Sequence, residues 1–467
     1  MTHLQYFYEI SKIPRPSGKE EKIADYLCEF AEKHGLEYYR DENRNVLINK
    51  QPSEGYENAP SFCIQGHTDM VCEKDIDSDH DFSKDPIDVY EENGMLKAHG
   101  TTLGADNGAA VAIMLALLSE DHKTPYLQCL FTAEEETGLC GASSFDYSKI
   151  TADFMINIDG EEEDEILTSC AGGLRVKLEN KYPTEEKDEC VKITVGGLAG
   201  GHSGADIDKN RTNASLVMFE LISRLCKKGA RLCFFEGGSK DNAITPYAVA
   251  TVVCDAGLVN EESKKLKEEL LPALCDEDKD IYINIEKTNG GSCISNEDTE
   301  SVCSLVSKLK TGIIKMSSSV EGFVSTSANM GIVKIENGAV ELCLSVRSED
   351  DEERNSVWEE YARVSKTYGY SSEKGQEYPG WKFKESSRLR GLYADAYKTV
   401  TGKDIKITAI HAGLECGIIS GALPSLDIIA IGPQMNYVHT TAEFMEIESF
   451  NRVFKTVSLC LERSKDI

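Results

Sequence analysis

Apolar residues near the start of the chain recur with the spacing of an α-helix. In residues 22–35 the apolar positions lie three or four apart and share one helix face: Ile23, Tyr26, Leu27, Phe30 and Ala31. Gly35 is typical of the position just after a helix, and Ser17 and Glu20 have the spacing of a capping box. This pattern predicts an amphipathic helix over residues 22–34, with an N-terminal cap that includes Ser17.

Short apolar runs alternate with helical patterns through the first third of the chain. Four runs have the composition of strands that are buried on both faces, at residues 45–50, 61–65, 126–132 and 154–158. The apolar residues 109–118 predict a buried helix between two of them. Such alternation predicts an α/β fold with a mostly parallel sheet covered by helices, in which ligands bind beyond the carboxyl ends of the strands.

The pattern changes near residue 181 and again near residue 380. Between these points, alternating strand patterns are mixed with amphipathic helices such as residues 213–229. A helical pattern at residues 387–402 and buried runs at 405–419 and 425–433 then resemble the first part of the chain. We therefore expect residues 1–180 and 381–467 to form one α/β domain, with an α+β domain inserted at residues 181–380.

The net charge and the cysteine content indicate which partners to exclude and in which cellular compartment to expect the protein. The 80 acidic and 50 basic residues give a net charge of −30, which repels phosphate backbones and anionic lipid. No run reaches the roughly 18 apolar residues of a membrane span, so we expect neither nucleic-acid nor membrane partners. The 16 cysteines are scattered without a C-x-x-C pair, and a chain of this length does not need disulfides. We expect reduced thiols and a cytoplasmic location.

Histidines and acidic residues stand where the predicted buried elements begin or end. His67 and Asp69 follow the run 61–65, and side chains two apart point the same way on a strand. The same event recurs along the chain, at Asp106, at Glu134 to Glu136, at Asp159 and at His439. Singly, an N-cap would explain Asp106, and a solvated loop would explain the glutamates.

The recurrence favours a common purpose for these residues. Two imidazoles and three carboxylates form a set that suits two zinc ions, and the members are His67, Asp106, Glu136, Asp159 and His439. Carboxylates brought together without cations would repel one another and be costly to bury. A pair of metal ions removes that conflict.

Several motifs occur in an order that resembles a known family. They are GHTDMV, LGADNGAA, FTAEEETG, NIDGEEE, GGLAGGHSGADI, NAITPYA, VRS, HAGLECG and VHTTAE. This set is similar to the di-zinc metallopeptidases related to carboxypeptidase G, carnosinase and bacterial tripeptidase, and within them to the aminoacyl-histidine dipeptidases. The resemblance covers nearly the whole chain. It implies a catalytic α/β domain and an inserted lid or dimerisation domain.

The resemblance also implies roles for the matching residues. His67 and Asp159 would bind one zinc ion, Glu136 and His439 the other, and Asp106 would bridge both. Asp69 would orient the His67 ring by hydrogen bonding. Glu135 would be the general base that takes a proton from the attacking water and passes it to the leaving amine. Mn²⁺ or Co²⁺ are possible substitutes for zinc.

The remaining matches concern the substrate. His202 would stabilise the oxyanion, from a partner subunit or a closing lid, and Asn242 and Arg347 would bind the substrate. His411 and Glu415 are further candidates for the pocket. A lone loop histidine or strand arginine is otherwise an ordinary surface residue, so these roles depend on the resemblance.

The implied enzyme is a dipeptidase for Xaa-His and related dipeptides, possibly β-alanyl-histidine, that acts as a homodimer. Two alternatives keep the same metal centre, as a tripeptidase or as an N-acyl-amino-acid deacylase. A third hypothesis is that the protein is not an enzyme but a catalytically silent metal-binding scaffold. No G-x-S-x-G motif is present, which disfavours a serine hydrolase.

Overall fold

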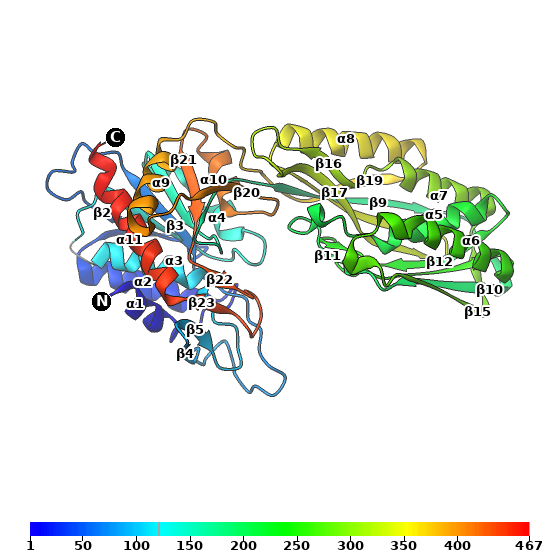
Figure 1. The fold of residues 1–467 in the computed structure, drawn as a ribbon, viewed down its shortest axis with the longest axis horizontal. Helices are drawn as coiled ribbons and strands as arrows, with labels where there is room; N and C mark the ends of the chain where they lie inside the picture. The colour runs from blue at the N-terminus through cyan, green and yellow to red at the C-terminus, as the bar shows by residue number, and fades with distance from the viewer. Residues whose placement is uncertain (120–121, 467) are drawn as a thin grey trace. The chain divides into compact units, whose positions relative to one another are not determined.

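The computed structural model describes residues 1–119 and 122–466, which divide into two compact units. The first unit contains Met1–Ser169, Trp381–Ala409 and Leu414–Ile467, and the second contains Cys170–Gly380 and Ile410–Gly413. In Figure 1 the first unit is blue, cyan, orange and red, so both chain ends belong to it, and the second is green and yellow. The sequence pattern places the first change at residue 181, whereas the second unit begins at Cys170.

An eight-stranded sheet forms the centre of the first unit, in the order β1-β2-β6-β3-β7-β21-β8-β20. The strands are β1 (Glu37–Arg40), β2 (Val46–Lys50), β3 (Phe62–His67), β6 (Leu127–Thr132), β7 (Phe154–Ile158), β8 (Glu165–Cys170), β20 (Lys406–Ile410) and β21 (Asp427–Ile431). The α/β class is confirmed, and the sheet is mixed. The central pairs β6/β3, β3/β7 and β7/β21 are parallel, while β1/β2, β2/β6 and β21/β8 are antiparallel.

Helices cover this sheet because its central strands β3, β6 and β7 are buried along their whole length. The helices are α1 (His3–Ile10), α2 (Glu21–His34), α3 (Ala105–Ser119), α4 (Cys140–Ser144), α9 (Arg388–Thr401), α10 (Glu415–Ala422) and α11 (Ile447–Arg463). Phe62 and Ile64 of β3 point into the core that includes the apolar residues of α3. Gln65 points the other way and donates to Glu415 at the start of α10. The buried helix predicted at residues 109–118 lies within α3.

Smaller elements complete the first unit. A four-stranded sheet has the order β22-β23-β5-β4, with β4 (Val89–Glu92), β5 (Met95–Ala98), β22 (Met435–Asn436) and β23 (Phe444–Glu446). Short 3₁₀ turns lie at Tyr147–Lys149 and Ser464–Asp466. No helix in the described ranges combines the length and apolar character needed to cross a bilayer.

The predicted amphipathic helix is present, but its predicted cap is wrong. Helix α2 ends before Gly35, which has a φ of 66° as expected for a C-terminal glycine. Its N-cap is Glu20, with no side-chain capping bond. Ser17 instead donates to Asp69 at 2.8 Å. A partner 52 positions away therefore takes the hydroxyl that the local spacing assigned to the helix.

A nine-stranded sheet forms the centre of the second unit, in the order β15-β10-β14-β12-β17-β18-β9-β19, with β16 paired to β17. The strands are β9 (Gly172–Lys181), β10 (Glu185–Gly196), β12 (Arg231–Gly237), β14 (Ala248–Val253), β15 (Tyr282–Cys293), β16 (Gly312–Met316), β17 (Val324–Glu336), β18 (Ala339–Ser348) and β19 (Ser371–Tyr378). A separate pair joins β11 (Gly201–His202) to β13 (Ala243–Ile244).

The second unit has its own apolar core between this sheet and its helices. The helices are α5 (Ala214–Cys226), α6 (Ala256–Leu270), α7 (Asn296–Lys308) and α8 (Asp351–Thr367), with 3₁₀ turns at Ile207–Lys209, Leu271–Ala273 and Asp276–Asp278. The helix predicted within residues 213–229 is α5.

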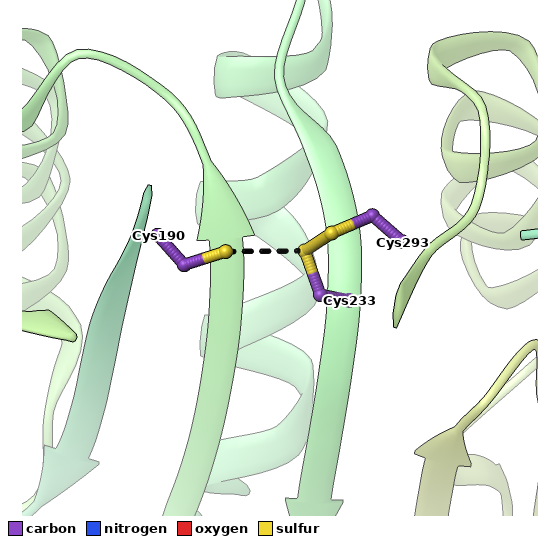
Figure 2. A group of neighbouring side chains, drawn as sticks. All are labelled: Cys190, Cys233 and Cys293. Carbon is purple, nitrogen blue, oxygen red and sulfur yellow. Dashed lines mark hydrogen bonds between the residues drawn. A yellow bond between two sulfur atoms is a disulfide. The ribbon is translucent and has the colours of Figure 1, made fainter. Parts of the chain in front are cut away.

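The expectation that all cysteines are reduced is wrong for one pair. Cys233 and Cys293 form a disulfide across a sequence separation of 60 residues (Figure 2). The backbone N–H of Ile294 donates to the carbonyl of Leu232 at 2.9 Å, which brings the two neighbouring cysteines together. Contacts so far apart leave no local spacing signal in the sequence.

Candidate metal centre

The predicted ligands lie at one edge of the first unit's sheet. His67 is the last residue of β3, Asp159 follows β7, and Glu135 and Glu136 follow β6. Because β6, β3 and β7 are parallel neighbours, their carboxyl ends open onto the same edge. Residues that are up to 92 positions apart are brought together by strand pairing alone.

Asp106, in the first turn of α3, lies between the two predicted histidine ligands. Its Oδ1 is 3.0 Å from His67 Nε2, and its Oδ2 is 3.1 Å from His439 Nε2. Each imidazole also faces a second carboxylate. His67 Nε2 is 3.4 Å from Asp159 Oδ1, and His439 Nε2 is 3.0 Å from Glu136 Oε1. One oxygen of Asp106 therefore belongs to each of two groups.

These side chains fit a pair of divalent ions. Within each group the potential ligand atoms lie within 4.8 Å of one another, and the two groups are His67, Asp106 and Asp159, and Asp106, Glu136 and His439. Imidazole nitrogens with carboxylate oxygens are a donor set that suits zinc and similar ions. The shared carboxylate of Asp106 gives the two groups a common member.

The electrostatics of the cluster also favour cations. Burial raises the pKa of Asp159 to about 6, and the nearby carboxylates of Asp106 and Glu136 add to that rise. Hydrogen bonds with Asp106 and Glu136 raise the pKa of His439 to about 11. Burial opposes a charge on His67, but its carboxylate partners outweigh burial and raise its pKa well above the usual value. Positive charge is thus stabilised at both imidazoles.

Asp69 fixes the orientation of the His67 ring. Its Oδ1 is 3.2 Å from His67 Nδ1 and accepts the backbone N–H of Glu135 at 3.1 Å. Its Oδ2 accepts the backbone N–H of Glu136 at 3.2 Å and the Ser17 hydroxyl at 2.8 Å. A carboxylate at Nδ1 selects the tautomer that leaves Nε2 available to a metal. The fully buried Asp69 therefore links one imidazole to the loop that carries two glutamates.

Glu135 lies next to the residues of the cluster. Glu135 forms a third group with His67 and Glu136, again with ligand atoms within 4.8 Å. Burial raises its pKa well above the usual value, and the carboxylates of Asp159 and Glu415 add to the rise. A carboxylate with a raised pKa is suited to accept a proton near neutral pH.

Glu415 is fully buried. It accepts hydrogen bonds from Gln65 Nε2 and, at 2.7 Å, from the Thr132 hydroxyl. Its Oε1 has no hydrogen-bond partner among the described residues, and burial raises its pKa to about 7.

In the second unit, His202 and Arg347 lie together. His202 Nδ1 accepts the backbone N–H groups of Gly204 and Ala205 at 3.3 and 3.0 Å, so the neutral ring carries its proton on Nε2. That Nε2 is 3.3 Å from Arg347 Nη2. Burial, followed by the charge of Arg347, lowers the pKa of His202 to about 4. With the proton on Nε2, His202 and Arg347 both present N–H donors, and an acceptor placed between them could bind both.

Arg347 has further donor capacity for an anion. Its Nη1 donates to the Tyr378 hydroxyl at 3.0 Å, while its buried Nε has no hydrogen-bond partner among the described residues. His411 is also buried and its Nε2 is 2.7 Å from the Ser327 hydroxyl. Asn242 has an exposed side chain, and its backbone carbonyl accepts the N–H of Ser203.

Three residues near these groups were not expected from the sequence. Arg15 and Glu443 contact backbone groups around the cluster in the first unit, and Tyr378 contacts Arg347 in the second. Glu443 ends the motif VHTTAE, four residues after His439, and Arg15 lies in the proline-flanked segment IPRPSG. Neither pattern identifies a contact with a distant backbone.

Comparison with known proteins identifies the family of this chain. The profile of peptidase family M20/M25/M40 matches residues 63–463. The cytosol non-specific dipeptidase of Escherichia coli K12 is 34% identical over 95% of this chain and 93% of its own. The aminoacylhistidine dipeptidase of Vibrio alginolyticus has a TM-score of 0.90 at 32% identity, covering 98% of this chain and 96% of that one. A tripeptidase of Staphylococcus aureus, at 16% identity over 100% of this chain and 98% of its own, shares the fold with a TM-score of 0.57. The chain therefore belongs to peptidase family M20/M25/M40 and is a metal-dependent peptidase.

Proposed function

We propose that this metallopeptidase is a cytoplasmic dipeptidase that uses two zinc ions to hydrolyse Xaa-His and related dipeptides, including β-alanyl-histidine. The observation that carries the proposal is the place of Asp106, whose two oxygens each face a different imidazole. The names of the Escherichia coli and Vibrio alginolyticus relatives, a cytosol non-specific dipeptidase and an aminoacylhistidine dipeptidase, support the substrate class and the compartment.

The proposed ligands follow the two groups around Asp106. His67 and Asp159 would hold one ion, Glu136 and His439 would hold the other, and Asp106 would contribute to both. Two bound zinc ions would supply Lewis acidity, polarising the peptide carbonyl and lowering the pKa of the attacking water. Mn²⁺ or Co²⁺ would suit the same donors.

Glu135 carries the proton in this proposal. Its carboxylate removes a proton from the attacking water and later delivers that proton to the leaving amine, so no covalent intermediate is needed. Asp69 keeps the ring of His67 in the tautomer that ligation requires. The two side chains act together because the backbone N–H of Glu135 donates to Asp69.

The residues of the second unit bind the ends of the substrate and stabilise the oxyanion. His202 keeps a proton on Nε2 and is suited to donate to a developing oxyanion. Arg347 offers the terminal carboxylate a guanidinium plane and an Nε from which no described residue accepts a hydrogen bond. We assign Asn242 and His411 to the same pocket. We assign Glu415 a supporting role near the substrate amino end, through Gln65 and Thr132.

The proposal also includes a domain division and an oligomeric state. The first unit forms the catalytic domain and the second unit forms a lid and dimerisation domain of a homodimer, with a boundary at Cys170 in place of the one expected at residue 181. Light scattering of the purified protein tests the homodimer, and a monomer at all concentrations would contradict it.

Metal analysis with a substrate panel tests the function. We expect two zinc ions per chain, loss of activity with a chelator, and hydrolysis of β-alanyl-histidine, Gly-His and Leu-Leu. A tripeptide and N-acetyl-histidine should react much more slowly, and preference for either would instead support a tripeptidase or a deacylase. Glu135→Gln should retain both ions and lose activity by about 10²- to 10⁴-fold. Two bound ions without hydrolysis of any of these compounds would indicate a silent scaffold.

A further inference from the structure

The carboxylate of Glu443 is surrounded by backbone N–H groups of the segment that leads to Asp106. Its Oε2 accepts the N–H groups of Leu103 and Gly104 at 2.7 and 3.0 Å. Its Oε1 accepts those of Ala105 and Asp106 at 2.8 and 3.4 Å. The side chain is 3% exposed. Burial raises the pKa of Glu443 and the backbone donors oppose that rise, while the carboxylate holds four consecutive peptide groups in one arrangement.

Arg15 connects the same segment to the loop after β3. Its Nη2 donates to the carbonyl of Gly104 at 2.5 Å, and its Nη1 donates to the carbonyls of Thr68 and Asp69 at 3.0 and 3.1 Å. The side chain is 2% exposed. Gly104 has a φ of 69°, and a Cβ there would lie 2.6 Å from Arg15 Nη2. The turn therefore needs glycine so that the guanidinium can reach all three carbonyls.

Together these two side chains connect three segments that carry ligands. Glu443 lies four residues after His439 on the same turn and contacts the segment of Asp106. Arg15 contacts that segment and also the loop that begins at His67. Buried charges of opposite sign thus bind the backbone from two sides, and each is satisfied by peptide groups.

We infer that Glu443 and Arg15 are positioning residues that set the distances between His67, Asp106 and His439. They thereby determine how tightly the second of the two metal ions binds once the first is in place. The inference rests on the proposed di-metal function. Neither side chain needs to touch an ion, because each acts on the backbone that carries a ligand. Groups that orient metal ligands typically change metal affinity by about 10- to 100-fold when they are removed.

The test measures zinc affinity directly. Glu443→Gln keeps the shape but replaces one acceptor oxygen by a donor, and Glu448→Gln on the exposed side of α11 is the matched control. We expect zinc competition with a chromophoric chelator to show about 10- to 100-fold weaker binding of one ion in Glu443→Gln. Excess zinc should restore kcat, and the control should match the wild type.

Arg15→Lys provides a second variant, since it keeps the charge and loses the planar fork. We expect the same weakening of one zinc site. Unchanged zinc affinity in folded Glu443→Gln and Arg15→Lys would overturn the inference, as would a loss of activity that excess zinc does not restore. If the wild type binds two ions but hydrolyses no dipeptide, the proposed function fails while the affinity comparison still decides this inference.

A separate cluster in the second unit contains three buried sulfur atoms. Cys190 lies on β10, Cys233 on β12 and Cys293 at the end of β15, and all three sulfur atoms lie within 4.8 Å of one another. The sulfur of Cys190 is 3.7 Å from that of Cys233, which is bonded to Cys293. Figure 2 shows the Cys233 sulfur between the other two.

The strand arrangement makes Cys233 the central member. The pairing of β12 with β14 shifts register between Leu232 and Phe234, so Cys233 occupies an irregular position in its strand. Cys190 lies opposite Thr288 on β15. The side chains of the three cysteines form their own small buried cluster, with Val253 packed against it.

The geometry points to a thiol–disulfide exchange site in which Cys233 pairs with either Cys293 or Cys190. Burial raises the pKa of the Cys190 thiol, so Cys190 must first give up its proton. Its sulfur then attacks that of Cys233, a new sulfur–sulfur bond forms, and the bond to Cys293 breaks. Cys293 leaves as a thiolate and takes up the proton that Cys190 released, so the step consumes neither oxidant nor reductant. The exchange replaces a link between β12 and β15 by a link between β12 and β10.

Disulfide mapping tests this site. The full-length protein is equilibrated in a glutathione redox buffer that forms the Cys233–Cys293 bond, quenched in acid, and digested without reduction. We expect peptides linked through Cys190–Cys233 as well as Cys233–Cys293 in the wild type. Cys293→Ser should give only Cys190–Cys233, and Cys190→Ser only Cys233–Cys293, while Cys254→Ser is the control for a nearby thiol.

Three results would each overturn the exchange. One is a Cys293→Ser protein in which Cys190 and Cys233 both remain free thiols in the same buffer. The second is a wild-type protein in which alkylation finds all three thiols free at every glutathione ratio. The third is absence of the Cys190–Cys233 link in the wild type, so mapping of the wild type alone decides the question if a variant does not fold.

Discussion

Replacement of Asp69 by asparagine tests whether the orientation of the His67 ring matters when the ring itself is still present. Asp69 is fully buried and its carboxylate has four partners: the His67 ring, the Ser17 hydroxyl, and the backbone N–H groups of Glu135 and Glu136. In Asp69→Asn the remaining oxygen can still face His67 and Glu135. The new amide then points an N–H at the N–H of Glu136. The variant keeps every proposed metal ligand and changes only the hydrogen bonds that hold the His67 ring and the backbone of Glu136 in place.

The size of the effect follows from that one lost bond. A hydrogen bond to a charged acceptor contributes about 1.5–3 kcal/mol, which corresponds to about 10- to 150-fold in an equilibrium or rate constant. We therefore expect Asp69→Asn to lower zinc affinity or kcat/KM for Gly-His by about 10- to 100-fold. Ser17→Ala removes one donor to Asp69 but leaves its bonds to His67, Glu135 and Glu136 in place, so the loss at the zinc site should be less than about tenfold.

Zinc competition and steady-state kinetics measure these effects, and the melting temperature of the metal-free protein verifies that the variant folds. Asp69→Asn protein that folds normally, binds zinc as tightly as the wild type and has the same kcat/KM would refute the reasoning. It would mean that the His67 ring and the Glu135–Glu136 loop keep their places without this carboxylate.

Three further predictions concern substrate binding, packing and pH. Arg347→Lys keeps the charge and loses the planar fork, so the KM for Gly-His should rise by about tenfold or more with a smaller change in kcat, and an unchanged KM would contradict carboxylate binding there. A Cβ at Gly66 would lie 2.4 Å from that of Ala110, so Gly66→Ala should lower the free energy of unfolding by about 1–3 kcal/mol in urea titrations. Because the folded-state pKa of His202 is lowered to about 4, the unfolded chain binds this proton first as pH falls below about 6.5. Stability should therefore decrease from pH 6.5 towards pH 4, and His202→Gln should show a smaller decrease in its urea midpoint; equal slopes would count against it.

Local patterns in the sequence were sufficient for several of the regular elements of the first unit. The amphipathic spacing before Gly35 corresponds to α2, and the apolar runs correspond to β2, β3, β6 and β7. Such patterns report burial, which is decided by each side chain's own chemistry. They do not report strand direction, so the antiparallel pairs β1/β2, β2/β6 and β21/β8 were not expected.

The groups at the ends of strands were visible for a related reason. A histidine or carboxylate soon after a buried strand lies at the carboxyl end of the sheet in an α/β fold, which singled out His67, Glu136 and Asp159. Asp106 stands at the start of a helix and His439 further beyond a strand, so their choice depended more on the family resemblance. The structure brings these five side chains into two groups that share Asp106.

The sequence by itself determined which segments are buried, which residues end them and to which family the chain is similar. Only the tertiary structure decided which backbone groups meet Glu443 and Arg15, that Ser17 supports Asp69 and not a helix end, and that Cys233 bonds with Cys293. The physical reason is that these contacts join atoms far apart along the chain. Their partners are mostly peptide groups, which every residue carries, so no pattern of side chains could have identified them.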